Sequence, residues 1–159
     1  MTAQPAQPQP DGSAQPAAVI VERHILARPE TVFGFFTDRD KWLSWMGSDG
    51  EFSFTPNGSY RTRVTGDNVA AGRFLEIDPP KRLVFTWGWA EGGMTDVPEG
   101  STTVEITLEP TEDGTLLRLV HSGLPTREAC AAHEEGWAHY TRRLTVRAEG
   151  GDPGPDHWM

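Results

Sequence analysis

The chain has 159 residues and a formal net charge of −9 at pH 7. This length suits one domain with a hydrophobic core and is short for two. The negative charge argues against a nucleic-acid partner, because phosphate binding requires a concentrated basic face. We therefore expect a single acidic domain that does not bind nucleic acid.

The single cysteine, Cys130, rules out an intramolecular disulfide and favours the reducing cytoplasm. The longest apolar run falls short of the roughly 18 residues that a membrane span needs. The N-terminus shows neither the cationic start nor the apolar stretch of a secretory signal. We expect a cytoplasmic protein without a membrane span.

The two ends of the chain differ in composition from its centre. Residues 1–17 are rich in Pro, Gln and Ala, so ordering them would bury little apolar surface, and we expect a disordered leader. Residues 150–159 carry Gly and Pro residues that end a helix, and we expect a flexible tail. This leaves one domain over residues 18–149.

Two short helices are predicted after a first strand at residues 19–26. Pro29 suits a first helical turn, and apolar residues follow it. Asp40 is placed to cap a second short helix, which Gly47 ends. These helices interrupt the strands before the main sheet begins.

Six strand-like segments follow, separated by turn signals such as Pro56-Asn57-Gly58 and Asp78-Pro79-Pro80. Alternation of apolar and polar residues is clearest from Lys81 to Trp89. Consecutive strands joined by short turns predict an antiparallel sheet with one packed face. The predicted strands are residues 51–55, 59–65, 69–77, 81–89, 102–108 and 115–121.

One long helix is predicted last, from Thr126 to Ala148. Its inner stripe, defined by spacings of three and four residues, mixes apolar and polar side chains. We expect it to cover the packed face of the sheet and to leave room for a ligand. The stripe contains Cys130, His133, Trp137, Tyr140, Thr141, Leu144 and Ala148.

Several short motifs, in their order and spacing, resemble the SRPBCC superfamily. Within it, the chain is similar to the branch named for the C-terminal domain of the activator of the ninety-kilodalton heat-shock protein ATPase. The resemblance implies an α+β helix-grip fold (START-like, Bet v-like), in which a curved antiparallel sheet wraps around a long C-terminal helix. The motifs are residues 23–33, Trp42, residues 72–87, residues 103–110, residues 121–124 and Gly136-Trp137.

The resemblance also implies a cavity between the sheet and the long helix that takes lipid-like or polyketide-like molecules. Superfamily members include carriers, receptors, cyclases and cochaperones, so the fold does not select one activity. The eukaryotic activators carry an additional N-terminal domain, and this chain has a short leader in that place, which argues against chaperone activation. Whether the chain forms a homodimer is a question that the resemblance leaves open.

Our leading hypothesis is a protein that binds a small hydrophobic ligand, more in keeping with a carrier than an enzyme. Aromatic residues line pockets and fill cores alike, so packing is the alternative for each of them. Trp42 and Trp45 would either form an aromatic flap over the mouth of the cavity or pack their short helix onto the edge of the sheet. The candidate ligand contacts are Trp42, Trp45, Tyr60, Phe85, Trp87, His121, His133, Trp137 and Tyr140.

Two other classes of function compete with this hypothesis. A cyclase or dehydratase would use His133 or His121 as a general acid or base, whereas a protein-interaction module would expose its aromatic residues. No metal or cofactor is expected. His133-Glu134 resembles the start of a zinc-protease motif, in which a second histidine lies one helical turn after the first. Here His139 follows six residues after His133, roughly 240° around the helix, so the two histidines do not share a face and a zinc site is not expected.

Overall fold

The computed structural model describes residues 18–158. The expected leader, residues 1–17, lies outside the described residues. The order of elements matches the α+β helix-grip prediction: a strand, two short helices, further strands and a long last helix. The elements are β1 (Val19–Ile25), α1 (Pro29–Gly34), α2 (Arg39–Leu43), β2 (Asp49–Phe52), β3 (Ser59–Thr65), β4 (Asn68–Asp78), β5 (Arg82–Trp87), β6 (Trp89–Glu91), β7 (Thr102–Pro110), β8 (Thr115–Ser122) and α3 (Arg127–Ala148).

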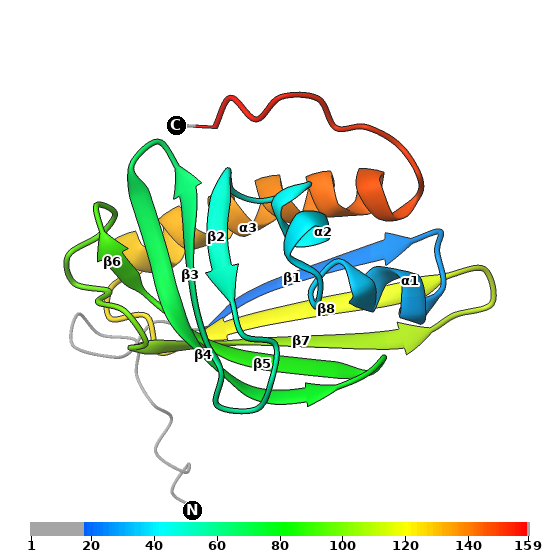
Figure 1. Cartoon of the computed structure of the whole chain (residues 1–159), viewed down its shortest axis with the longest axis horizontal. Coiled ribbons are helices and arrows are strands. Elements are labelled where there is room, and N and C mark those ends of the chain that lie inside the picture. Colours follow the sequence, from blue (N-terminus) through cyan, green and yellow to red (C-terminus); the bar gives the residue numbers. More distant parts are fainter. Residues whose placement is uncertain (1–17, 159) are drawn as a thin grey trace, which may run out of the picture.

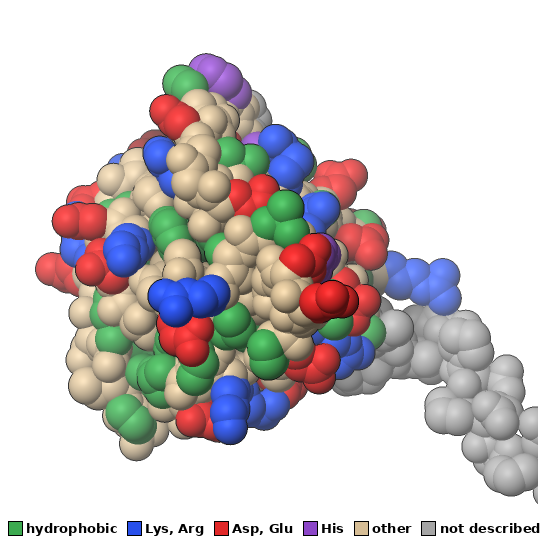
Figure 2. All heavy atoms as spheres, turned by 90° about the vertical axis from the view of Figure 1, so that its right-hand side faces the viewer, with side chains coloured by type: hydrophobic (Ala, Val, Ile, Leu, Met, Phe, Trp, Pro, Cys, Tyr) green, Lys and Arg blue, Asp and Glu red, His purple; other side chains and the backbone are tan. Residues whose placement is uncertain are grey.

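The strands form one curved antiparallel sheet in the order β1-β8-β7-β5-β4-β3-β2, and β6 pairs with β4. Helix α3 crosses the concave side of this sheet, with α1 and α2 beside it (Figure 1). No helix within residues 18–158 is long and apolar enough to cross a membrane. The face seen in Figure 2 carries interspersed acidic and basic side chains.

The predicted alternation is confirmed in the β7–β8 hairpin. Val104, Ile106 and Leu108 are buried along β7, and Val104 pairs with His121 on β8. Because side chains of a strand alternate between faces, this register places His121 on the packed face of the sheet, beneath α3.

The N-cap of helix α2 lies two residues earlier than predicted. The side chain of Asp38, not Asp40, accepts a hydrogen bond from the Lys41 backbone N–H at 3.0 Å. The helix ends at Leu43, so the prediction of Asp40 as the cap was wrong, and Trp45 lies just beyond the helix.

The predicted continuous strand from Lys81 to Trp89 is divided in two. A Cβ atom added at Gly88 would lie 1.7 Å from the carbonyl oxygen of Pro98, so only glycine fits where the two backbones meet. The Trp89 N–H donates to the Val97 carbonyl at 2.8 Å. Both β5 and β6 pair with β4, but on its other side the chain leaves β7 at Gly88 and meets Pro98 instead. Seven strands therefore follow α2 instead of six.

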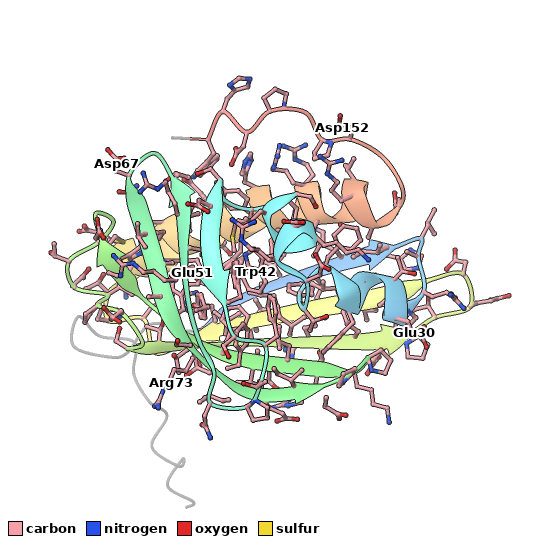
Figure 3. All side chains as sticks on the ribbon, in the orientation of Figure 1. Glu30, Trp42, Glu51, Asp67, Arg73 and Asp152 are labelled. Atoms are coloured by element: carbon pink, nitrogen blue, oxygen red, sulfur yellow. The ribbon has the colours of Figure 1, made fainter. Side chains whose placement is uncertain are left out.

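An aromatic core fills the space between α2 and the sheet. Trp42 is 0% exposed, and its ring meets Phe52 and Phe85 at centroid distances of 5.0 and 5.7 Å. Figure 3 shows Trp42 inside the molecule, between α2 and the strands. The indole N–H of Trp45, which is 1% exposed, donates to the Phe35 carbonyl at 3.1 Å. Both tryptophans are packed residues, as the packing alternative expects.

Helix α3 is held at both sides by arginine side chains. Its start is capped by Thr126, whose hydroxyl accepts from the Ala129 N–H at 3.0 Å. Arg23 on β1 donates to the Ala138 carbonyl at 2.8 Å, and Arg143 on α3 donates to the Trp45 carbonyl at 3.1 Å. These contacts tie α3 to β1 on one side and to the segment after α2 on the other.

The segment 150–158 returns along α3 (Figure 1). Asp156 accepts hydrogen bonds from the Tyr140 hydroxyl at 2.7 Å and pairs with His139 Nε2 at 2.8 Å. The ring of Trp158 stacks on His139 with centroids 4.7 Å apart. The segment that we expected to be a flexible tail therefore has specific contacts with α3.

Candidate ligand-binding site

A pocket of about 300 Å³ lies between the sheet, the first half of α3 and the C-terminal segment. It is built from the ends of β3 and β5, the start of β4, β6 with its following loop, and α3. Ala132 and Gly93 are exposed at its rim. The lining residues are Met46, Val64, Thr65, Asn68, Trp87, Trp89, Gly93, Met94, Ala132, His133, Gly136, Trp137, Tyr140 and Trp158.

Four tryptophans from four different elements dominate the lining, and we call Trp87, Trp89, Trp137 and Trp158 the tryptophan box. The ring centroids of Trp87 and Trp89 are 5.4 Å apart at 78°, and those of Trp87 and Trp137 are 5.1 Å apart at 55°. Since the rings are inclined to one another, they form the walls of a concave site rather than one flat stack.

His133 lies at the wall of the pocket with both ring nitrogens engaged. Its Nε2 accepts from the indole N–H of Trp89 at 3.2 Å. Its Nδ1 lies 2.8 Å from the Ala129 carbonyl, so the ring carries its proton on Nδ1. These two contacts fix both the tautomer and the orientation of the neutral ring.

His121 lies deeper, at 0% exposure, and is engaged in the same way. Its Nδ1 accepts from the indole N–H of Trp137 at 3.0 Å. Its Nε2 therefore carries the proton and donates to the Thr102 hydroxyl at 2.8 Å. That hydroxyl in turn donates to the Trp87 carbonyl at 2.7 Å. The chain of hydrogen bonds joins two tryptophans of the box to the sheet.

Both histidines are neutral near pH 7. Burial and, to a smaller extent, the neighbouring His133 together lower the pKa of His121 to about 3. Burial also lowers the pKa of His133, against smaller opposing effects of the Ala129 carbonyl and Asp96. The two rings meet edge to face with centroids 5.1 Å apart, so charging either one would be costly.

This arrangement limits what the histidines can do chemically. A general base needs a free lone pair within hydrogen-bond reach of the substrate. The lone pair of His133 accepts from Trp89, and that of His121 accepts from Trp137. Each histidine here orients an indole ring, and proton abstraction would first require that hydrogen bond to break.

The pocket lining has further polar groups, among them the buried indole N–H of Trp87, which has no hydrogen-bond partner within residues 18–158. The Asn68 side chain donates to Thr65 Oγ1 at 3.0 Å and accepts from the Gly93 N–H at 3.0 Å, which ties the loop after β6 to β4. Burial and the hydrogen bond to Asp156 raise the pKa of Tyr140. Burial acts to raise the pKa of Asp156, but hydrogen bonds from Tyr140, the Trp158 backbone and His139 lower it below its ordinary value.

Gly136 leaves part of the pocket wall open in the middle of α3. A Cβ atom at this position would meet nothing within 4 Å. Glycine in a helix interior costs about 0.5–1 kcal/mol relative to alanine, and packing does not require it here. Because Gly136 has no side chain, the pocket is wider at this position of α3.

The structure brings together four of the nine candidate residues in the pocket lining, namely Trp87, His133, Trp137 and Tyr140. His121 lies directly behind this wall, bonded to Trp137. The other four, Trp42, Trp45, Tyr60 and Phe85, belong to the aromatic core and are at most 3% exposed.

Sequence reasoning missed several lining residues. Trp89 shares the alternation of Trp87, which was a usable signal, but the divided strand hid its role. Gly136 had a signal too, since an isolated glycine in a helical pattern often has a packing or functional reason. Met94 lies far from α3 in sequence, and Trp158 follows α3 by ten residues in a segment without a periodic pattern, so no local pattern places them there. Within the described residues no group of three potential metal ligands comes together.

The curved sheet, the last helix and the pocket between them define a helix-grip protein. The chain belongs to the family described as Activator of Hsp90 ATPase homolog 1-like protein, which matches residues 26–149. It is similar to the AHSA1-like protein from Rhizobium etli, with 46% identity and a TM-score of 0.72 over 94% of this chain and 92% of that one. A comparison with curated proteins finds no match.

Two further solved structures share the fold. The Aha1 dimer from Colwellia psychrerythraea is 22% identical, with a TM-score of 0.73 over 87% of this chain and 99% of that one. DynU16, a protein in the dynemicin biosynthetic locus, is 25% identical with a TM-score of 0.76. The match covers 94% of this chain and 52% of DynU16.

Proposed function

We propose that the protein binds a small, largely apolar molecule in the pocket between the sheet and α3. The observation that carries this proposal is the tryptophan box, which lines a pocket of about 300 Å³. Ligand pockets in proteins span roughly 300–1,000 Å³ and combine apolar walls with a few polar groups. The ligand is therefore small, at the lower end of that range.

The way the walls are held supports binding over simple packing. Indole N–H groups of Trp89 and Trp137 are fixed by His133 and His121, so contacts within the protein hold the orientation of these rings. A site whose walls are held in place loses little conformational entropy when a ligand enters. Similarity to DynU16, a protein in a biosynthetic locus, also supports a small-molecule ligand.

The enzyme alternative receives less support from the geometry. Both candidate bases, His133 and His121, already accept hydrogen bonds from indole groups. A protein-interaction role that relies on exposed Trp42 and Trp45 loses its basis, because both are buried. Cytoplasmic location and self-association stay predictions.

Native mass spectrometry of the freshly purified protein, followed by its mass after denaturation, tests whether a small molecule is retained. Titration with the neutral apolar dye N-phenyl-1-naphthylamine then tests whether the pocket takes up a probe. Gly136→Leu is the blocking variant, because leucine suits a helix and its side chain enters the open space at Gly136. Ala131→Leu, at an exposed position of α3 outside the lining, is the matched control.

We expect a retained compound or dye binding in the unmodified protein and in Ala131→Leu, and at least tenfold weaker dye binding in Gly136→Leu. If neither a compound nor the dye binds, the pocket is not a ligand site. Equal dye binding by the two leucine variants would place the binding site elsewhere on the molecule.

A further inference from the structure

The segment after α3 brings Trp158 to the pocket, and this residue lies outside the part of the chain that matches the family. The family match ends at residue 149, whereas Trp158 lines the pocket together with Gly136 and Tyr140 of α3. Residues 151–158 belong to neither a helix nor a strand. The contacts that hold this segment therefore decide where one wall of the pocket stands.

Backbone hydrogen bonds hold only the start of the segment. Within the described residues they join it to α3 as far as Gly151, whose N–H donates to the Val146 carbonyl at 2.8 Å. Beyond Gly151 every contact with α3 involves a side chain, and we call residues 152–158 the strap. A segment held by a few partly exposed side-chain contacts is displaced at a lower free-energy cost than a helix or a sheet strand.

Alternate residues of the strap contact α3 in the reverse chain direction (Figure 1). Two residues of the strap correspond to four residues of the helix, because two extended residues span about 6.6 Å and four helical residues span about 6 Å. The contacts are Asp152 with Arg147 at 3.6 Å, the Gly154 carbonyl with Arg143 at 3.0 Å and Asp156 with His139 at 2.8 Å. One further step in this register brings Trp158 to the turn of α3 that contains Gly136.

Trp158 stands at the edge of an open space in the pocket. A Cβ atom added at Gly136 would meet nothing within 4 Å, so the strap does not fill the position that Gly136 leaves free. The ring of Trp158 stacks on His139 with centroids 4.7 Å apart and planes inclined at 23°. The ring therefore bounds the pocket on this side without filling it.

Asp156 fixes the last part of the strap, next to Trp158. Its carboxylate accepts from the Tyr140 hydroxyl at 2.7 Å, pairs with His139 Nε2 at 2.8 Å and accepts from the Trp158 backbone N–H at 3.0 Å. Hydrogen bonds to a charged carboxylate are stronger than those between neutral groups. Loss of this carboxylate would leave the stacking on His139 to hold the ring of Trp158.

We propose that Trp158 sets the upper size limit of the ligand, and that Asp156 is the positioning residue that holds this wall against α3. The inference rests on the proposed function, because it concerns the ligand of the same pocket. It adds a size class: the ligand is a compact apolar molecule that fits a pocket of about 300 Å³, and a longer molecule must displace the strap. It also gives a role to a segment outside the family match.

Equilibrium titration of the full chain with two neutral dyes of different length tests this inference. N-phenyl-1-naphthylamine is the compact dye, and 1,6-diphenyl-1,3,5-hexatriene is the long one. The readout is the ratio of their two dissociation constants, because a change in the folded fraction affects both dyes alike. Trp158→Ala should shift this ratio at least fivefold toward the long dye. His157→Ala, at the neighbouring exposed residue outside the lining, is the matched control and should leave the ratio unchanged.

Two further variants test the positioning role of Asp156. Asp156→Ala removes the bonds to Tyr140 and His139 and keeps Trp158, so it should shift the ratio in the same direction by a smaller factor. The double variant Asp156→Ala/Trp158→Ala should match Trp158→Ala alone, because no ring remains to be positioned. An unchanged ratio in Asp156→Ala would show that the carboxylate does not position the wall.

The outcomes separate this inference from the proposed function. If the compact dye binds but Trp158→Ala leaves the ratio unchanged, the size limit is overturned and the ligand site stays in place. An equal shift in His157→Ala, or binding of the long dye that survives Gly136→Leu, would also overturn it, because the effect would then not depend on the ring or on the pocket. If neither dye binds and native mass spectrometry finds no retained compound, both proposals fail.

Discussion

The buried histidine His121 makes a specific prediction for the pH dependence of stability. In the folded protein its pKa is lowered to about 3 by burial and then by His133, whereas an unfolded histidine has a pKa of about 6.5. Below that value the unfolded chain takes up a proton that the folded protein does not. Stability is therefore lost as the pH falls below about 6.5, and the loss continues down to about 3.

The size of the effect follows from these two values. Each pKa unit between the folded and unfolded states is worth about 1.36 kcal/mol, so lowering the pH from about 7 to about 5 should cost about 2 kcal/mol through His121. His133, whose pKa is lowered as well, acts in the same direction. Urea unfolding followed by circular dichroism at several pH values measures this loss.

His121→Gln removes the titrating group and keeps its hydrogen bonds. The glutamine oxygen can accept from the Trp137 indole, and its amide can donate to the Thr102 hydroxyl, in place of the bonds at 3.0 and 2.8 Å. The variant should lose about 2 kcal/mol less than the unmodified protein over the same pH range. If both proteins lose stability equally, His121 is not the buried neutral group that we describe.

Three further substitutions have expected outcomes. Gly136→Ala should stabilise the protein by about 0.4–1 kcal/mol, because a Cβ atom meets nothing within 4 Å; a lower melting temperature in calorimetry would show that the space is not open. Trp137→Phe should cost about 1–3 kcal/mol in urea unfolding, because His121 Nδ1 loses its donor, and an unchanged stability would contradict this. Asp156→Asn should speed amide hydrogen exchange in residues 152–158, because Tyr140 and His139 lose a charged partner; unchanged exchange would show that the carboxylate does not hold the segment.

Much of the fold could be predicted because local patterns and global topology agree. The alternation in β7 and β8 and the capping residue Thr126 of α3 depend on near neighbours in sequence. The division of the strand at Gly88 could not be predicted, because its cause is the carbonyl of Pro98. Such a contact exists only once the chain has folded.

The candidate site was predictable in part for the same reason. Trp137 and His133 share a helical stripe, and the covering helix makes any residue on that stripe a candidate. Whether an aromatic residue faces the pocket or the core depends on the curvature of the sheet. Trp42 and Trp87 both suit an interior position, yet only Trp87 lines the pocket, and local sequence carries no signal for that difference.

The tryptophan box gives the protein an optical reporter of its own. Four of the six tryptophans line the pocket, and the other two, Trp42 and Trp45, are buried in the core. Rings as close as Trp87 and Trp137, 5.1 Å apart, couple their electronic transitions, so the near-ultraviolet circular dichroism of the box should depend on what occupies the pocket beside the rings. Occupancy can then be followed without any label, against the constant background of the two core indoles.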